Sequence, residues 1–210
     1  MFTLYATPLS ANGRKVLSVA HHLGLHPDVR IVDVYKGEGR SKEYLAINPT
    51  GKIPTLVEDD WVLWESNAIL QYMSEAHADD RLGSKHPRRR ADIARWLYWE
   101  SAHWQPAFVP VLSAFVGRLI VPQLRDLPEV VVDWNEPKFE AIARFLDGHL
   151  QGRAHLVEGA LTLADFSVAG MMTYARKASF PFDAYPNIAR WYAGVEALES
   201  WRSSAVEPWG

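Results

Sequence analysis

The sequence contains no cysteine among its 210 residues. This absence excludes disulfide bonds, thiolate metal sites and a thiol nucleophile supplied by the protein. No apolar run is long enough to span a membrane, and no glycine-rich phosphate-binding motif is present. Residues 1–5 lack the charged segment and the long apolar stretch that mark a signal peptide, so we expect a soluble, cytoplasmic protein.

The sequence also lacks a strong charge of either sign, since its formal net charge is −3. The compact basic run at residues 88–90 is typical of a solvated helix start rather than of a nucleic-acid patch. His22 and His26 have a helical ligand spacing, but Gly24 and Pro27 interrupt the helix that a metal site would need. We therefore expect no nucleic acid, membrane or metal among the partners.

The first 77 residues alternate between strand and helix patterns. Short runs rich in strand-forming residues predict strands at 2–6, about 29–34, 55–58 and 61–64, the last two forming a hairpin. Apolar residues at helical spacing predict helices at 14–23, at about 43–47 and from Ser66 onward. The order β-α-β-α-β-β-α predicts a small α/β domain built on one sheet.

The rest of the chain is predicted to be helical. A polar stretch at 78–87 is expected to be a linker, and residues 88–210 are expected to form an all-α domain. Its first helix contains Pro106 and Pro110, which should kink or break it. Further helices are predicted around 139–146 and 188–198, and we assign Trp96, Trp191 and Trp201 to the core.

The first segment that indicates chemistry is 48–56, Asn-Pro-Thr-Gly-Lys-Ile-Pro-Thr-Leu. A proline entering a strand belongs at its first residue or at a sheet edge. If the Ile53-Pro54 bond is cis, the Ile53 backbone can pair with an extended peptide ligand. An ordinary loop proline before a strand is the alternative.

Two helix starts supply the context. Ser66 stands where a helix begins, and the N–H groups there favour a bound carboxylate, while Glu65 can accept from a ligand ammonium. Ser10 and Asn12 stand just before the first helix, where hydroxyl, amide and helix dipole can stabilise an anion. In each case a simple helix cap with a neighbouring surface residue is the alternative.

Taken together, these segments resemble the glutathione-transferase superfamily along essentially the whole chain. The resemblance rests on Asn-Pro-x-Gly-Lys-Ile-Pro at 48–54 and Glu-Ser-x-Ala-Ile at 65–69. It is supported by Leu-Thr-Leu-Ala-Asp-Phe at 161–166, where Thr162 and Asp165 form a capping-box pattern with a structural role. It implies a thioredoxin-like α/β domain followed by an all-α helical domain.

The resemblance also implies roles for individual residues. Ile53 would pair with the cysteinyl backbone of glutathione, and Glu65 and Ser66 would hold its γ-glutamyl end. Lys52 and Arg40 would lie near the glycyl carboxylate. Ser10 matches the catalytic serine of the serine-type (phi/theta-like or bacterial) classes, and Asn12 is the alternative thiolate donor.

The implied activity is attack of the glutathione thiolate, with glutathione as co-substrate, on small hydrophobic electrophiles. Trp104, Phe108 and Phe115 are candidates to line the electrophile pocket, with a place in the core or a dimer interface as the alternative. Glutathione-dependent reduction of peroxides or disulfides, or a non-catalytic binding scaffold, are the other functions that this resemblance allows. It further implies a homodimer.

Overall fold

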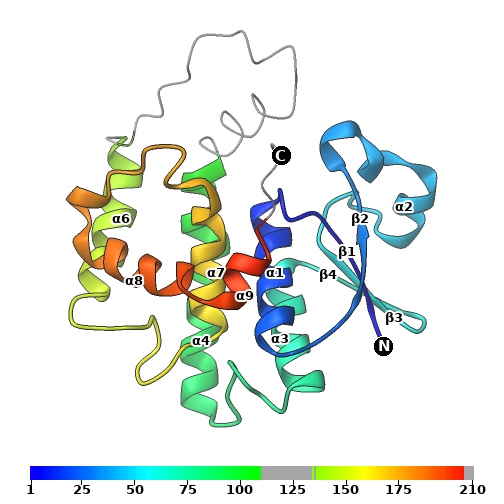
Figure 1. Ribbon diagram of the computed structural model, residues 1–210, viewed down its shortest axis with the longest axis horizontal. Helices are drawn as coiled ribbons and strands as arrows, with labels where there is room; N and C mark the ends of the chain where they lie inside the picture. The colour runs from blue at the N-terminus through cyan, green and yellow to red at the C-terminus, as the bar shows by residue number, and fades with distance from the viewer. Residues whose placement is uncertain (110–133, 135, 206–210) are drawn as a thin grey trace, which may run out of the picture.

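The computed structural model describes residues 1–109, 134 and 136–205. The N-terminal part forms a four-stranded mixed sheet in the order β2-β1-β3-β4 (Figure 1). β1 (Thr3–Ala6) pairs in parallel with β2 (Asp28–Ile31) and antiparallel with β3 (Thr55–Glu58). β3 forms a hairpin with β4 (Trp61–Trp64), as predicted.

Helices cover both faces of this sheet. α1 (Ala11–His22) and α3 (Ser66–His77) pack against each other on the face turned toward the rest of the molecule. α2 (Lys42–Ile47) lies beyond the opposite face, with the short helices η1 (Val34–Lys36) and η2 (Glu38–Arg40) before it in the chain (Figure 1). The predicted thioredoxin-like α/β arrangement is therefore confirmed.

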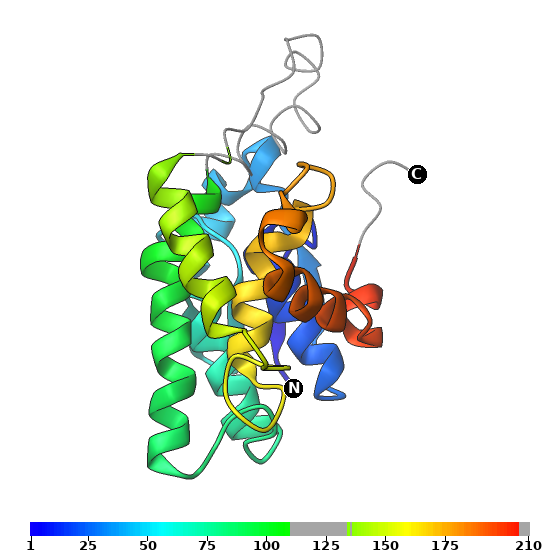
Figure 2. The same cartoon turned by 90° about the vertical axis from the view of Figure 1, so that its left-hand side faces the viewer.

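The second part consists of helices joined by loops, with no strand among its described residues. It contains the helices α4 (Pro87–Trp99), α6 (Pro137–His149), α7 (Leu163–Met171), α8 (Pro186–Glu196) and α9 (Glu199–Ser203), with the short turns η5 (Met172–Tyr174) and η6 (Phe182–Ala184). Figure 2 shows α4 and α6 running side by side. Within the described residues no helix is long and apolar enough to cross a membrane.

α7 is the central helix of this second part, because it packs against α1, α4 and α8. All nine of its residues are buried. Its start is fixed by the predicted capping box of Thr162 and Asp165. The Asp165 carboxylate accepts from the backbone N–H of Thr162 at 2.9 Å and from the indole N–H of Trp191 at 2.9 Å. The structural role predicted for Asp165 is confirmed.

Local capping explains where two predicted boundaries shift. α1 begins at Ala11 rather than at residue 14, because the Ser10 hydroxyl accepts from the Gly13 N–H and caps the helix. β2 ends at Ile31, because the Asp33 carboxylate accepts from the N–H groups of Tyr35 and Lys36 and starts η1. Side chains that cap a helix compete with strand extension.

The helix that begins at α4 continues past Pro106, so this proline does not break it, but the regular helix is interrupted directly before it. The backbone passes into a π-helical turn, η3 (Glu100–Trp104), where the Gln105 N–H bonds to the Glu100 carbonyl, and stays helical to residue 109. A proline ring collides with the preceding turn of a regular helix. The wider turn directly before Pro106 gives that ring room. Pro110 lies outside the described residues.

A buried ion pair joins the two parts of the chain. The ammonium of Lys15 in α1 lies 3.1 Å from the Glu100 carboxylate in η3, and both side chains are fully buried. The same ammonium donates to the Asn67 amide oxygen at 2.9 Å, and the Ser167 hydroxyl donates to that oxygen at 2.7 Å. This polar network fixes the start of α3 relative to α4 and α7.

Candidate functional site

A small polar pocket of about 90 Å³ lies where the loops of the sheet meet the first turn of α3 and the η3 segment. Both parts of the chain contribute to it. It is lined by Asn12, Asn48, Thr50, Lys52, Ile53, Pro54, Trp64, Glu65, Ser66, Ser101 and Gln105.

The wall formed by residues 48–54 is organised by a buried amide. Asn48 is fully buried, and its amide N–H₂ donates to the Lys52 carbonyl at 2.9 Å and to the Thr55 hydroxyl at 2.8 Å. The Tyr44 hydroxyl donates to the same carbonyl at 2.7 Å. These bonds hold the loop closed from within, so Ile53 is presented at the pocket.

The Ile53-Pro54 peptide bond is cis, the geometry that the sequence allowed as one of two alternatives. Ile53 precedes β3, whose ladder pairing begins at Thr55. In the described part of the chain no hydrogen bond to the Ile53 backbone is present. Gly51 enables the preceding turn, because its φ is +66° and an added Cβ would lie 2.7 Å from the Gly39 carbonyl oxygen.

The second wall is the start of α3. Glu65 precedes the helix with a φ of 73°, a conformation that non-glycine residues rarely adopt and that is concentrated at functional sites. It makes no side-chain bond to the first-turn N–H groups. Ser66 is the first helical residue, 8% exposed, and its hydroxyl donates to the Asn12 amide oxygen at 3.1 Å. The first-turn N–H groups therefore remain available to an anion.

The start of α1 supplies the third wall. Asn12 lines the pocket, and its bond to Ser66 uses the amide oxygen, which leaves its N–H₂ group to donate elsewhere. The Ser10 hydroxyl accepts from the Gly13 N–H at 3.3 Å and so keeps its own proton for donation. Ser10 is the N-cap of α1 but is not among the residues that line the pocket.

The structure thus brings five predicted site residues to one pocket: Asn12, Lys52, Ile53, Glu65 and Ser66. Two others lie outside its lining. Ser10 stands two residues before Asn12. A guanidinium nitrogen of Arg40 lies 3.3 Å from the position that a Cβ added to Gly51 would occupy. Arg40 therefore reaches the turn at Gly51, the residue directly before Lys52.

The predicted electrophile-pocket residues lie elsewhere. Trp104 is fully buried and donates from its indole N–H to the Val168 carbonyl at 3.1 Å. Phe108 is 1% exposed, and its ring centroid lies 4.6 Å from that of Trp104. Both side chains belong to the core, which was the alternative, because they face α7 and the aromatic cluster around Phe139. Phe115 lies outside the described residues.

Sequence reasoning missed the contribution of the second part of the chain to the pocket. Ser101 and Gln105 line it from η3 and the turn after it. Their spacing of four, the separation of neighbours on one helix face, was the signal that could have revealed them. Asn48 was quoted only as part of a motif, although its amide holds the loop.

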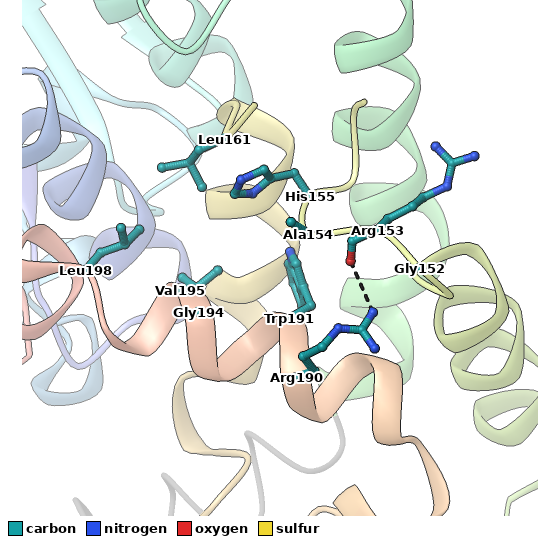
Figure 3. Close-up of a pocket in the computed structure, with 10 residues that line it drawn as sticks. All are labelled: Gly152, Arg153, Ala154, His155, Leu161, Arg190, Trp191, Gly194, Val195 and Leu198. Carbon is teal, nitrogen blue, oxygen red and sulfur yellow. Dashed lines mark hydrogen bonds between the residues drawn. The ribbon is translucent and has the colours of Figure 1, made fainter. Parts of the chain in front are cut away.

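A larger hollow of about 660 Å³ lies between the 152–161 loop and α8 (Figure 3). Its lining includes the apolar side chains of Leu161, Trp191, Val195 and Leu198, and no predicted site residue. Among the described residues no three histidine or acidic side chains gather to hold a metal ion. The chemistry predicted from the sequence therefore concentrates in the small polar pocket.

Comparison with known protein families assigns both parts of the chain. Residues 4–81 match the family described as the N-terminal domain of glutathione S-transferase. Residues 102–199 match the family described as its C-terminal domain. The two matches cover the sheet, the helices around it and most of the helical part.

Solved structures agree with this assignment over nearly the full length. Glutathione transferase F7 from Populus trichocarpa is 26% identical with a TM-score of 0.84, and the match covers 97% of each chain. A delta-class glutathione transferase from Nilaparvata lugens is 27% identical with a TM-score of 0.82, covering 99% of this chain and 94% of that one. A possible glutathione S-transferase from Rhodopseudomonas palustris is 27% identical with a TM-score of 0.82, covering 95% and 88%.

Proposed function

The chain belongs to the glutathione S-transferase superfamily, and from this premise we propose that the small polar pocket binds glutathione and activates its thiol for attack on a small electrophile. The observation that carries the proposal is the meeting, in one pocket, of the start of α3, the start of α1 and an Ile53 backbone that bonds to none of the described residues. Glutathione is an extended peptide with a carboxylate at each end and one ammonium.

Each part of glutathione has a matching group in the pocket. The first-turn N–H groups of α3, that of Ser66 included, suit the γ-glutamyl carboxylate, and Glu65 suits the ammonium beside it. The Ile53 backbone suits the cysteinyl peptide. Lys52, supported by Arg40, suits the glycyl carboxylate. The pocket recognises the peptide chiefly through charge-assisted hydrogen bonds.

Activation of the thiol needs only a moderate energy. A free cysteine thiol has a pKa of about 8.5, so roughly 3% is thiolate at pH 7. Lowering that pKa by about two units makes roughly three quarters thiolate, which corresponds to about 2.7 kcal/mol. One hydroxyl hydrogen bond together with the N-terminal end of α1 is a sufficient source for a stabilisation of this size.

Ser10 is our proposed thiolate donor, with Asn12 as the alternative. Both keep a donor group free: the Ser10 hydroxyl accepts from Gly13, and the Asn12 amide accepts from Ser66 through its oxygen. In the chemical step the thiolate sulfur forms a bond to an electrophilic carbon. In a substitution the leaving group departs with its electron pair, and in an addition the adjacent atom takes a proton from water.

The test begins with calorimetric titration of glutathione into the protein, followed by conjugation to chlorodinitrobenzene. Loss of the ultraviolet thiolate absorbance in Ser10→Ala, with retention in Ser10→Thr, supports Ser10, because threonine keeps both the hydroxyl and the cap. The reverse result, with Asn12→Ala abolishing the absorbance and Ser10→Ala leaving it intact, assigns Asn12. Absence of glutathione binding refutes the whole proposal. Binding without conjugation points to peroxide or disulfide reduction, or to a scaffold.

We further propose that the protein acts in the cytoplasm as a homodimer, the assembly typical of this family. Trp61 on the edge strand β4 is 43% exposed and Tyr98 on α4 is 73% exposed, and exposed aromatic side chains are enriched at protein interfaces. Light scattering coupled to size-exclusion chromatography should give twice the chain mass of 23.8 kDa. A single-chain mass at micromolar concentration would contradict this assembly.

A further inference from the structure

The position of Ser10 depends on the peptide that joins it to Leu9. In this peptide unit the N–H group is that of Ser10, and it donates to the Thr7 carbonyl at 3.1 Å. The preceding N–H, that of Leu9, donates to the Thr7 hydroxyl at 3.4 Å. Thr7 itself is 4% exposed and lies directly against α1, since a Cβ on Gly13 would come within 2.2 Å of the Thr7 carbonyl oxygen. One end of the peptide is thereby anchored.

The other end of the same peptide is held from the helical part. The Tyr174 hydroxyl, at the end of η5, donates to the Leu9 carbonyl at 2.7 Å across 165 residues of sequence. A peptide unit is planar, so its carbonyl and its N–H turn together. With the N–H bound to Thr7 and the carbonyl bound to Tyr174, the unit cannot rotate without breaking one of two hydrogen bonds. The backbone direction at Ser10 is therefore set from both sides.

Tyr174 is suited to remain a donor under all working conditions. Its side chain is 7% exposed, and burial raises the pKa of its hydroxyl to about 12, with Tyr35 acting in the same direction and Arg14 against it. The hydroxyl thus keeps its proton. Arg14, in the first turns of α1, is itself held by α9, because its guanidinium donates to the Trp201 carbonyl at 3.2 Å.

We propose that Tyr174 is a positioning residue for the reaction: by binding the Leu9 carbonyl, it fixes the direction of the Ser10 hydroxyl toward the glutathione thiolate. This inference rests on the proposed function. It assigns to the helical part a second role at the site, in addition to the pocket wall that Ser101 and Gln105 form. Tyr174 acts through Ser10 and is not among the residues that line the pocket.

The experiment compares Tyr174→Phe with Tyr192→Phe, a closely matched control. The Tyr192 hydroxyl donates to the Met172 carbonyl, also at 2.7 Å, and Tyr192 is 1% exposed in the same helical part. Each substitution removes a buried hydroxyl that donates to a backbone carbonyl. Only the first frees the Leu9–Ser10 peptide.

The expected result is a higher pKa for the thiol of bound glutathione in Tyr174→Phe, measured by ultraviolet titration. Since one neutral hydrogen bond contributes about 0.5–1.5 kcal/mol, kcat/KM should fall about 2- to 10-fold at neutral pH. Glutathione affinity, which depends on Ile53, Glu65 and Ser66, should change by less than about 2-fold. Tyr192→Phe should lose comparable stability with the thiol pKa unchanged.

A double-mutant cycle makes the inference sharper. If Tyr174 acts through Ser10, Tyr174→Phe adds no further loss of activity in a Ser10→Ala background. Additive losses overturn the inference, and so does a thiol pKa in Tyr174→Phe equal to that of the native protein. If Tyr174→Phe does not fold, Tyr174→Trp fills the same site with a ring that lacks the hydroxyl, and so it also frees the Leu9–Ser10 peptide. An unchanged thiol pKa in that variant is then the refuting result.

The two proposals fail in different ways. If native protein binds no glutathione, the proposed function fails before Tyr174 is tested. If native protein forms the thiolate and Ser10→Ala removes it while Tyr174→Phe has no effect, the proposed function stands and the positioning role is wrong. If Asn12→Ala alone removes the thiolate, Ser10 is not the donor, and the positioning role assigned to Tyr174 falls with it.

Discussion

Replacing Lys15 by methionine should destabilise the protein strongly, because it leaves the Glu100 carboxylate buried without its countercharge. Both side chains are fully buried and 3.1 Å apart. Burial lowers the pKa of Lys15 and Glu100 raises it, with burial the larger cause. The cost of desolvating the two charges therefore offsets most of the attraction between them. Each charge nevertheless needs the other, because a buried charge without a partner is strongly destabilising.

The magnitude follows from what remains around Glu100. Removing one partner of a buried ion pair costs about 3–5 kcal/mol. The Asn67 amide at 2.8 Å and the Ser167 hydroxyl at 3.2 Å still donate to one carboxylate oxygen. The other oxygen is buried and has no hydrogen-bond partner among the residues that the structure describes. We expect the lower end of the range, about 3 kcal/mol, which for a chain of this size lowers Tm by roughly 6–12 °C.

The assay is urea unfolding followed by tryptophan fluorescence, with Arg144→Met as the matched control. Arg144 pairs with Glu140 one helical turn away on the surface of α6, where such pairs contribute about 0.3–0.5 kcal/mol. The double variant Lys15→Met/Glu100→Leu should recover most of the loss, because it removes the unpaired charge. A loss in Lys15→Met no larger than in Arg144→Met, or no recovery in the double variant, would refute this account of the pair.

Three further outcomes are expected. Gly13→Ala should cost at least about 2 kcal/mol in urea unfolding, since its Cβ would lie 2.2 Å from the Thr7 carbonyl oxygen; wild-type stability would contradict the close approach. Asp165→Ala should cost about 3–5 kcal/mol, because several buried donors lose their acceptor; a loss below about 1 kcal/mol would contradict this role. The Tyr72 hydrogen bond, and next His77, lower the pKa of Glu58 below 4.5, so its stabilisation is present above pH 4.5 and is lost as the pH falls through the lowered value. Tyr72→Phe should therefore flatten the acid side of the stability profile, and an unchanged profile would refute the assignment.

The fold could be predicted closely wherever the local sequence pattern favours the same structure as the packing of the core. The hairpin at 55–58 and 61–64 was placed correctly, because alternating strand residues flank two aspartates at its turn. The capping box of Thr162 and Asp165 was recognised from its spacing alone. The chain's own motifs therefore carry enough information for the sheet and for the central helix.

The site was predicted less completely, for physical reasons that particular residues show. Trp104 is a large aromatic residue of the kind that often lines ligand pockets. Its position around the helix decides whether the ring faces a cavity or the core, and here the ring faces the core and its indole N–H donates to the Val168 carbonyl. Ser101 and Gln105 are ordinary polar residues whose place in the pocket follows only from the packing of the two parts. Lys15 is the clearest case, since no local pattern indicates that a lysine is fully buried.

The π-helical turn at Glu100–Trp104 has a consequence for how this helix tolerates changes of length. Each helical residue advances the chain by about 100° around the axis, and a π turn accommodates one residue more than a regular turn. Within or directly after this turn, Glu100 reaches the buried ammonium, Ser101 and Gln105 line the pocket, and Trp104 bonds to α7. A one-residue deletion within this turn would restore a regular turn and keep the helix beyond it in phase, whereas the same deletion within the regular helix of α4 would rotate everything beyond it by about 100°.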